Sequence, residues 1–393
     1  MREASPLHGP VLTNGARVRG LAAAISSITA VGVALGLSLP LLALLLEQRG
    51  ITSAWIGINS AVAGIAAIGV TPFVTALARR FGTAQLTFAM TFIAAVTFSF
   101  FFLIENFWLW FPLRLVFHGS LAMVFVLSEF WINSLAPESR RGLVMGIYAT
   151  ILSLGFVAGP LIFAAFDTLS FMPFAIGTGI LLLASFPALL ARKSSPRLES
   201  GSNGPFIRFL LIAPMATMAG FVFGAVESGA MTLLPLYGLK IGLEQTKAAL
   251  LVSAFVGGNV MMQIPMGLLA DRYERRQLLT LCAAVGFFGA LLIPVFSGTF
   301  TLLAPYLFLW GGVIAGLYTI SLTHLGSRFT GADLASANAA FVMMYATGML
   351  TGPASLGVAL DTDVPSAMAW TLAGYFALYL FIAFWRMRTP EGR

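Results

Sequence analysis

Long apolar runs separated by short polar segments dominate this sequence of 393 residues. A helix rises 1.5 Å per residue, so about 20 consecutive apolar residues cross the roughly 30 Å hydrocarbon layer of a bilayer. By this criterion the pattern predicts an all-α integral membrane protein with twelve transmembrane helices. The predicted spans are 21–46, 52–78, 84–104, 107–133, 142–166, 171–191, 207–236, 247–270, 277–297, 300–325, 334–359 and 365–385.

The composition agrees with a surface that faces lipid. Hydrophobic residues make up 59% of the chain and charged residues only 9%, whereas soluble domains carry about 25% charged residues. So few charges cannot cover a water-facing surface, which excludes soluble, disordered and collagen-like proteins. Met1–Gly20 is polar and lacks the apolar core of a signal peptide, so the first run is predicted to be a retained span.

Lysine and arginine are unevenly distributed between the two sides predicted by these spans. If both ends of the chain lie on one side, 18 of the 22 basic residues fall on that side. Arg49, Lys240 and Lys247 fall on the other side, and Arg114 lies within a span. Because positive charge collects on the cytoplasmic side, we expect both termini to be cytoplasmic. This distribution accounts for the net charge of +7 without nucleic-acid binding.

Sequence landmarks recur at an offset of about half the chain. A Gly-x-x-x-Gly-Pro pattern occurs in the fifth predicted span and again 193 residues later (353 minus 160) in the eleventh. Pro72 and Pro265 differ by the same 193 residues, which predicts a duplicated six-helix unit. The polar segment near the middle predicts bundles over 1–191 and 207–393, joined by a cytoplasmic linker over 192–206. The residues of the repeated pattern are Gly155, Gly159, Pro160, Gly348, Gly352 and Pro353.

One loop motif carries a resemblance to a known family. The segment Gly267–Arg276 reads GLLADRYERR, and it resembles the glycine-x-leucine-alanine-aspartate-arginine-x-glycine-arginine-arginine motif of the major facilitator superfamily. It departs from that motif at Glu274, where glycine is usual. The run from Glu129 to Tyr148 is similar to the YcaD-like bacterial branch, and Gly155–Pro160 is similar to a motif associated with antiporters.

This resemblance covers essentially the whole chain. It implies two pseudosymmetric six-helix bundles in a bacterial inner membrane that work by alternating access. It also implies that the first, fourth, seventh and tenth spans line a central cavity. Because each half completes the cavity of the other, we expect a monomer. Packing between helices explains the repeated glycines as well, because glycines four residues apart let helices approach closely.

The loop motif is predicted to act as a conformational latch at the cytoplasmic surface. Asp271 and Arg272 end the eighth span, where an aspartate can pair with arginines or with the positive N-terminus of a helix. A solvated turn is the alternative, and Arg79 replaces the aspartate in the first-half copy. The candidate gating residues are Gly267, Asp271, Arg272, Arg275, Arg276, Glu129 and Arg141.

Charges at span depth are costly, so they mark candidate functional groups. Arg114, His118 and Glu129 lie along one face of the fourth span. At 100° per residue around the helix axis, His118 is 40° and Glu129 is 60° from Arg114. We expect Arg114 either to anchor an anion or to pair with Glu227. Glu129 lies near the cytoplasmic end, where it pairs with Arg140 or Arg141 or contacts a substrate or proton.

Glu227 is the candidate for proton coupling. It lies among small residues in the seventh span, where a carboxyl between apolar surroundings and neighbouring charges can bind and release a proton. A static ion pair between the halves is the alternative. The neutral candidates for hydrogen bonds to a substrate are Asn59, Asn259, Gln263, Tyr318 and Asn338.

These features together predict a secondary active transporter without a cofactor or a metal site. The lone Cys282, the three dispersed histidines and the missing GxxxxGK[ST] pattern point away from metal and nucleotide chemistry. We favour proton-coupled export of small organic or amphiphilic compounds. Proton-symport uptake of a sugar or organic acid is the alternative, and a non-transporting receptor or a membrane enzyme is a remote one.

Overall fold

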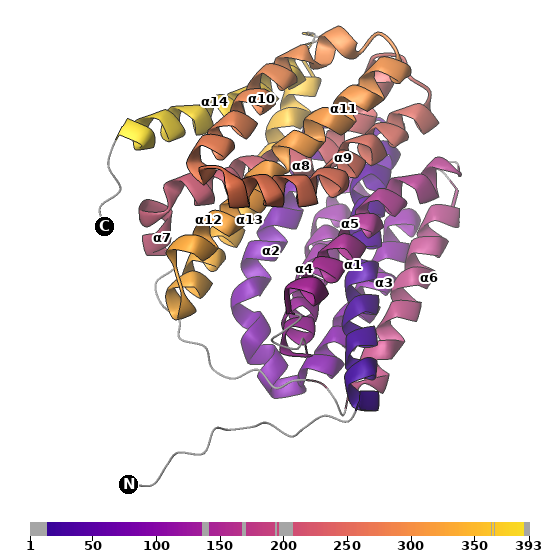
Figure 1. The fold of residues 1–393 in the computed structure, drawn as a ribbon. Coiled ribbons are helices and arrows are strands. Elements are labelled where there is room, and N and C mark those ends of the chain that lie inside the picture. The colour runs from indigo at the N-terminus through magenta and orange to yellow at the C-terminus, as the bar shows by residue number, and fades with distance from the viewer. Residues whose placement is uncertain are drawn as a thin grey trace.

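The computed structural model describes residues 14–135, 141–166, 170–192, 195, 207–362, 364 and 366–388, and every regular element within them is a helix (Figure 1). Eleven helical segments there are long and apolar enough to cross a membrane, and the apolar Thr150–Ala164 is shorter. The elements are α1 (Asn14–Gln48), α2 (Ser53–Phe81), α3 (Thr83–Leu103), η1 (Phe107–Leu109), α4 (Trp110–Leu135), α5 (Arg141–Ala164), α6 (Met172–Leu190), α7 (Ile207–Ile212), α8 (Pro214–Lys240), α9 (Gln245–Arg272), α10 (Arg275–Phe296), α11 (Phe300–Ile314), α12 (Gly316–Arg328), α13 (Gly331–Leu360) and α14 (Ala367–Arg388).

Two predicted spans each contain two helical segments, but only one of them has a residue outside the helical region. The span predicted over 207–236 divides at Ala213, whose φ of −124° and ψ of 50° leave the helical region. Pro214 follows at the start of α8, where its missing N–H costs nothing. The span predicted over 300–325 passes from α11 to α12 at Ala315, whose φ of −59° and ψ of −22° stay helical, so Phe300–Arg328 remains one span. Gly311, Gly312 and Gly316 bring the backbone there close to α9 and α10. The apolar pattern predicted neither the break at Ala213 nor the change of element at Ala315.

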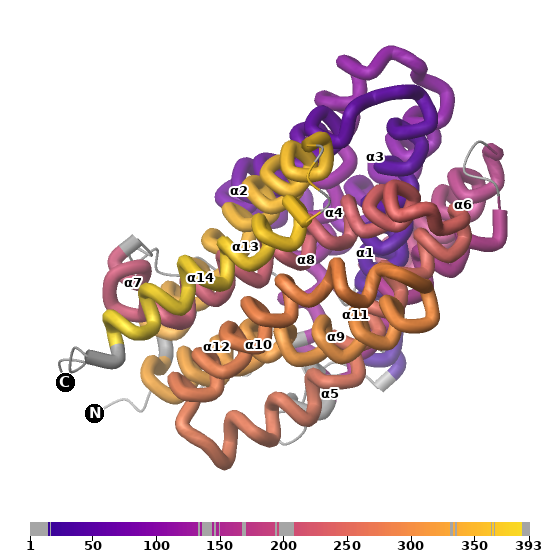
Figure 2. The backbone as a smooth tube through the Cα atoms, turned by 90° about the horizontal axis from the view of Figure 1, so that it is seen from above, coloured from indigo at the N-terminus to yellow at the C-terminus, as the bar shows by residue number. Residues whose placement is uncertain are grey.

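The helices of the two predicted halves are inclined to one another. In Figure 1, α2, α3 and α6 run close to vertical, whereas α10 and α11 of the second half cross the view obliquely. The halves meet through α2 with α13, α5 with α9, and α1 with α8. Figure 2 shows α13 running beside α2 in the view from above. Contacts between the halves are therefore made by pairs of long helices.

The end of the bundle at which α1 begins and α14 ends is here called the basic end, and the opposite end is called the far end. The described contacts between α2 and α13 concentrate at the far end. At the far end both carboxylate oxygens of Asp361 accept hydrogen bonds, from Ser53 N and Ala54 N, each at 2.8 Å. Gly57 lies directly against the carbonyl of Pro353. The Asp361 carboxylate thus caps the N-terminus of α2 from the other half.

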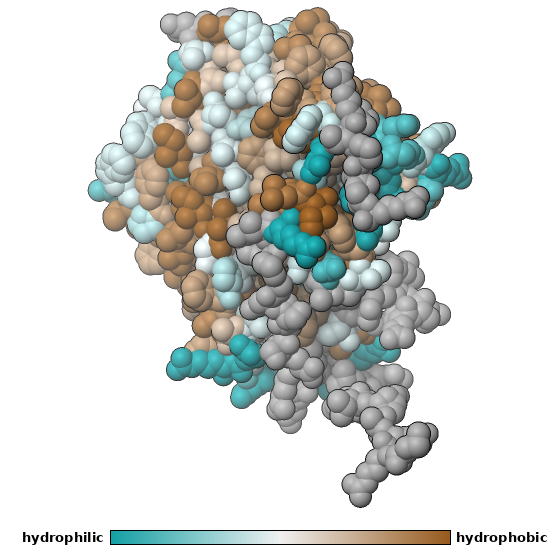
Figure 3. All heavy atoms as spheres, turned by 90° about the vertical axis from the view of Figure 1, so that its left-hand side faces the viewer, coloured by the Kyte–Doolittle hydropathy of each residue, from teal (hydrophilic) through white to brown (hydrophobic). Residues whose placement is uncertain are grey.

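Burial separates central helices from peripheral ones. Within an apolar stretch of 18 residues in each helix, 89% of the residues are buried in α1 and in α8, against 33% in α2 and in α6. Large apolar side chains remain exposed on the periphery, among them Leu183 and Leu190 of α6. Figure 3 shows brown apolar side chains spread over one side of the molecule. Such a surface is suited to lipid rather than to water.

Basic side chains serve as caps for the carboxyl ends of helices. The last carbonyls of a helix lack partners within it and carry partial negative charge, so a cationic donor stabilises them. The pairs are Arg17 with the Leu135 carbonyl, Arg49 with Ile104, Lys240 with Leu360, Arg276 with Arg386, and Arg386 with Leu211. Among the described residues the only ion pair within 4.0 Å joins Lys247 and Glu244.

Candidate functional site

Arg114 lies in a buried polar group where α2, α4 and α8 meet. Its Nε donates to Asn59 Oδ1 at 2.5 Å, and its Nη1 donates to Ser60 Oγ at 3.4 Å. Ser60 Oγ in turn lies 3.0 Å from Thr232 Oγ1 on α8. All four side chains are at most 1% exposed. Because α2 and α8 belong to different halves, this group crosses the interface between them.

Arg114 has no counter-charge among the described residues. It is the only buried lysine, arginine, aspartate or glutamate there, and no acidic side chain lies within 4.0 Å of it. Its Nη2 and the Nδ2 of Asn59 are buried without hydrogen-bond partners. An uncompensated buried charge costs several kcal/mol, about the scale of a protein's net stability. Among the described residues the positive charge of Arg114 is therefore uncompensated.

His118 lies one helical turn along α4 from Arg114 and is 3% exposed. Its Nδ1 lies 3.2 Å from the Arg114 carbonyl, so that nitrogen is the donor in this contact. The ring packs edge-on against Phe117, and Nε2 has no partner. Backbone and aromatic contacts thus hold the imidazole next to the arginine.

Glu227 occupies a second, separate polar group on α8. Tyr345 of α13 donates its hydroxyl to Glu227 Oε2 at 2.6 Å. Asn259 of α9 also lies against this carboxylate, although neither of its amide atoms meets the geometry of a hydrogen bond. These partners are neutral, and no ion pair joins Glu227 to Arg114 in this conformation. The carboxyl is therefore not fixed in its ionised form by a neighbouring cation.

The other neutral candidates are dispersed around these two groups. Tyr318 of α12 packs against Phe223 at 5.6 Å and against Tyr345 at 6.1 Å between ring centroids. Gln263 of α9 donates to Ser153 Oγ of α5 at 3.4 Å, which links the two halves. Asn338 is half-buried, two turns before Tyr345 on α13 and nearer the basic end. Tyr318 therefore adjoins the Glu227 group, while Gln263 serves the interface.

Glu129 differs from the other two residues on the predicted face of α4. Its side chain is exposed, whereas those of Arg114 and His118 are buried. Glu129 lies near the basic end of α4 (Trp110–Leu135). The predicted pairing of Glu129 with Arg140 or Arg141 stays a prediction, because residue 140 and the side chain of 141 lie outside the described residues.

The loop motif contains helix caps rather than an ion pair in this conformation. Asp271 and Arg272 are exposed. Glu274, where the family motif has glycine, caps α10 by accepting from Arg276 N at 3.0 Å and Gln277 N at 2.8 Å. Arg275 donates to the Ala270 carbonyl at 3.1 Å. Around these residues lies a pocket of about 470 Å³ that His324 and Arg328 also line.

The repeated glycines lie at close contacts between helix backbones. A Cβ added at Gly155 would lie 2.7 Å from Val33 N of α1, and one at Gly159 would meet the Gly36 and Leu37 backbone. In the second half, Gly348 and Gly352 pack in the same way against α8. No neighbour lies within 4 Å of a Cβ at Gly267. The equivalent helix contact thus recurs in both halves.

Several residues that complete these groups were not predicted from the sequence. Ser60 and Thr232 bridge the halves beside Arg114, Tyr345 holds Glu227, and Asp361 caps α2. Small hydroxyl residues and tyrosines are common in transmembrane helices, so their types alone carry little signal. The sequence shows Asp361 as an acidic residue directly after a long span. It does not show that this carboxylate accepts a hydrogen bond from Ala54 N, 307 residues away.

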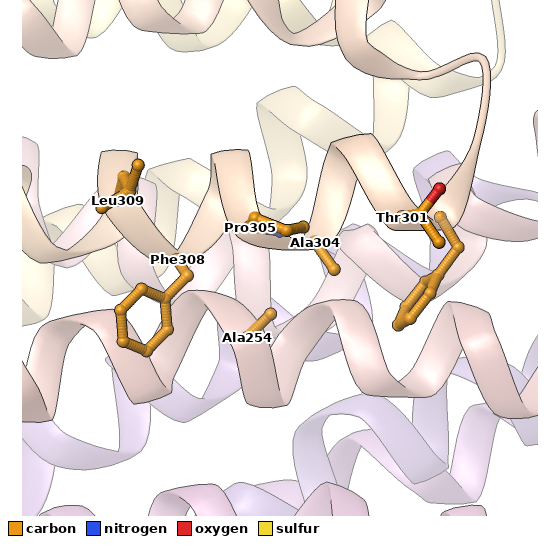
Figure 4. A pocket seen from close by; sticks show the side chains of 7 residues that line it. Ala254, Thr301, Ala304, Pro305, Phe308 and Leu309 are labelled. Carbon is orange, nitrogen blue, oxygen red and sulfur yellow. The ribbon is translucent and has the colours of Figure 1, made fainter.

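A pocket of about 590 Å³ between α9 and α11 is less suited to a polar solute. Figure 4 shows Ala254 of α9 facing Ala304, Pro305 and Phe308 of α11, with Thr301 as the labelled side chain bearing a hydroxyl. Its neighbour Leu309 is 57% exposed on the apolar periphery. The pocket therefore belongs to the lipid-facing surface.

Comparisons with known proteins agree with this architecture. The sequence model of the Major Facilitator Superfamily matches residues 24–255 and 216–393. An uncharacterized MFS-type transporter, YfkF of Bacillus subtilis (strain 168), is 25% identical over 337 residues, covering 84% of this chain and 86% of YfkF. YcaD of Escherichia fergusonii, also described as an uncharacterized MFS-type transporter, is 24% identical over 71% of this chain and 73% of its own length.

Solved transporter structures share the fold. The nucleoside transporter NupG superposes with a TM-score of 0.77 at 15% identity, covering 96% of this chain and 100% of NupG. A bacterial homologue of the human lysosomal transporter Spinster, in an inward-facing and occupied conformation, gives a TM-score of 0.77 at 13% identity. That match covers 96% of this chain and 98% of the homologue. At these identities the likeness concerns the fold alone.

Proposed function

Because this chain belongs to the major facilitator superfamily, we propose that it couples movement of a small organic solute to protons through Glu227, by alternating access. Its relatives and structural neighbours are membrane transporters, not enzymes. The observation that carries the proposal is the Glu227 carboxyl, which is held at span depth by neutral partners. A carboxyl without a fixed cation exists with or without its proton at modest cost, as coupling requires.

The contacts between the halves support alternating access. Asp361 and the helix pair α2–α13 join the halves at the far end. Gln48 of α1 adds a hydrogen bond of 2.9 Å to Gln245 of α9 at the same end. With the basic end in the cytoplasm, these contacts keep the outer side closed. Rocking the halves apart there would open the opposite face.

The proposal places the protein as a monomer in the bacterial inner membrane with both termini in the cytoplasm. A reporter fused after Arg393 tests this orientation. We expect a fluorescent protein at that position to fluoresce and alkaline phosphatase at the same position to be inactive. The same two reporters inserted between α1 and α2, at Gly50, should give the opposite result. Active phosphatase at the C-terminus would contradict the orientation.

We favour export as the direction, on the strength of the antiporter-like pattern in α5. A second candidate is proton-symport uptake of an organic acid, and the uncompensated Arg114 guanidinium favours it. Deletion of the gene distinguishes the two. Loss of an exporter raises the internal level of its solute, whereas loss of an importer lowers its uptake.

Replacing Glu227 by glutamine tests the coupling. Glutamine keeps the shape and can still accept the Tyr345 hydroxyl, but it cannot bind a transported proton. In proteoliposomes we expect Glu227→Gln to lose accumulation driven by a pH gradient while keeping exchange of the solute across the membrane. Glu244→Gln, which alters a surface glutamate in the Lys247 ion pair, is the matched control. Accumulation by Glu227→Gln at the rate of the parent protein would remove this role.

A further inference from the structure

The strongest unexplained feature of the interior is a pair of unpartnered donors, one on Arg114 and one on the neighbouring Asn59. A guanidinium has five N–H groups, and hydrogen bonds of Arg114 use only Nε and Nη1. Nη2 of Arg114 and Nδ2 of Asn59 are buried without partners. Their acceptor neighbours, Ser60 and Thr232, are already engaged with one another. An incoming acceptor group would satisfy donors that the chain leaves unpaired.

The charge of that group follows from the charges around it. Arg114 contributes one buried positive charge, and no acidic side chain among the described residues pairs with it. Glu227, the acidic candidate on the neighbouring helix, is held by Tyr345 instead. One negative charge would balance the site. A dianion would leave a surplus charge where the described interior offers no second buried lysine or arginine.

The geometry of a guanidinium selects among monoanions. Its planar fork matches the two oxygens of a carboxylate, which can accept from two of its N–H groups at once. Asn59 Nδ2 adds a neutral donor of the kind that orients a carboxylate. A carboxylate is therefore the group that best completes this site.

The remainder of the solute would meet mostly apolar and aromatic groups. Along α8, Thr232 lies nine residues from Phe223, or about 14 Å at 1.5 Å per residue. Phe223 forms an aromatic cluster with Tyr318 and Tyr345. Glu227 is the one charged side chain of α8 between these points, and its carboxylate is held by the Tyr345 hydroxyl.

We propose that the transported solute is a monocarboxylate with an apolar or aromatic body, and that Arg114 and Asn59 bind its carboxylate where α2, α4 and α8 meet. This rests on the proposed transport function and names its substrate class. Because Thr232 brings the second half to the same group, binding there joins α8 to α2 and α4. The solute thereby supplies the counter-charge that the protein lacks.

Benzoate and benzamide provide a matched test, because they differ by one charge at nearly constant shape. We expect benzoate and phenylacetate, at millimolar concentration, to raise the unfolding temperature of the full chain in nanodiscs. Benzamide, benzylamine and the dianion phthalate should not. Arg114→Gln should weaken benzoate binding about 30-fold or more, the usual result of removing one member of a buried charge pair. Equal shifts for benzoate and benzamide, or none for either carboxylate, would overturn the proposal.

The unliganded Arg114→Gln protein separates a binding role from a structural one. If the charge awaits a ligand, removing it should leave the apo protein at least as heat-stable as the parent. A lower unfolding temperature for the apo variant would instead indicate that Arg114 holds the helices together, and would contradict the proposal. Glu244→Gln, which alters an exposed carboxylate in the Lys247 ion pair, should leave benzoate binding unchanged.

Failure of this inference is distinguishable from failure of the proposed function. Proton-coupled flux of an amine or a neutral solute, unaffected by Arg114→Gln, would overturn the carboxylate assignment and leave the transport mechanism standing. Carboxylate binding lost in Arg114→Gln, without any solute-driven proton flux in proteoliposomes, would overturn proton coupling and leave the carboxylate assignment standing.

Discussion

Alanine at Gly159 is expected to destabilise the protein by about 1–3 kcal/mol, the usual cost of forcing extra atoms into a packed interior. A Cβ at this position meets the backbone of Gly36 and Leu37 on α1, and backbone atoms cannot rotate away as a flexible side chain can. The two helices must therefore separate. Alanine at Gly352 should act similarly, because its Cβ meets the Ala225 backbone on α8.

Thermal unfolding in detergent measures this effect, and Gly374 of α14 provides the control. No neighbour lies within 4 Å of a Cβ at Gly374, so alanine there should be neutral or gain up to about 1 kcal/mol from its higher helix propensity. Gly159→Ala and Gly352→Ala should unfold at lower temperature than Gly374→Ala. Unfolding temperatures indistinguishable among the three variants would show that these contacts are not tight.

Replacing Asp361 by alanine is expected to shift the protein away from the conformation described here. The Asp361 carboxylate accepts from Ser53 N and Ala54 N, and it places negative charge at the positive end of α2. Removing a side-chain cap of this kind costs about 1 kcal/mol. Because the cap joins the two halves, losing it should lower the ratio of molecules with a closed far end to molecules with an open far end roughly fivefold.

Spin-label distances between the far-end loops 104–106 and 241–244 report this shift. We expect the distribution in Asp361→Ala to gain a longer component, and Asp361→Asn, which keeps one acceptor, to gain less of it. Asp333→Ala is the matched control, since Asp333 is an exposed acidic residue at the opposite end of α13. A distribution unchanged in Asp361→Ala would mean that apolar contacts between α2 and α13 hold the far end closed by themselves.

The charged groups at span depth are predictable from the sequence, but their partners are not. Arg114 and Glu227 stand out as charges in apolar runs, because lipid and apolar packing make any charge there costly. One alternative held that they pair with each other, and in this conformation each is held by neutral groups of other helices instead. Tyr345 lies 118 residues from Glu227, and no local pattern marks it among the eight tyrosines of the chain.

The placement of the candidate site along α4 shows the same limit. Helical periodicity placed Glu129 within 60° of Arg114, yet the structure buries one side chain and exposes the other. Direction around a helix follows from its 3.6-residue turn. Burial depends on how far the neighbouring helices extend and how they tilt, which periodicity does not contain.

The sequence by itself determined the class of protein, the length of its spans and the glycine pattern of its repeat, because these depend on local hydrophobicity and on hydrogen bonds within each helix. The tertiary structure decided where a span breaks, which neutral groups surround Arg114 and Glu227, and that Asp361 caps α2 across the two halves. Those features depend on the crossing and tilt of helices distant in the chain. Lipid makes every span apolar alike, so the pattern that reveals the spans does not reveal how they pair.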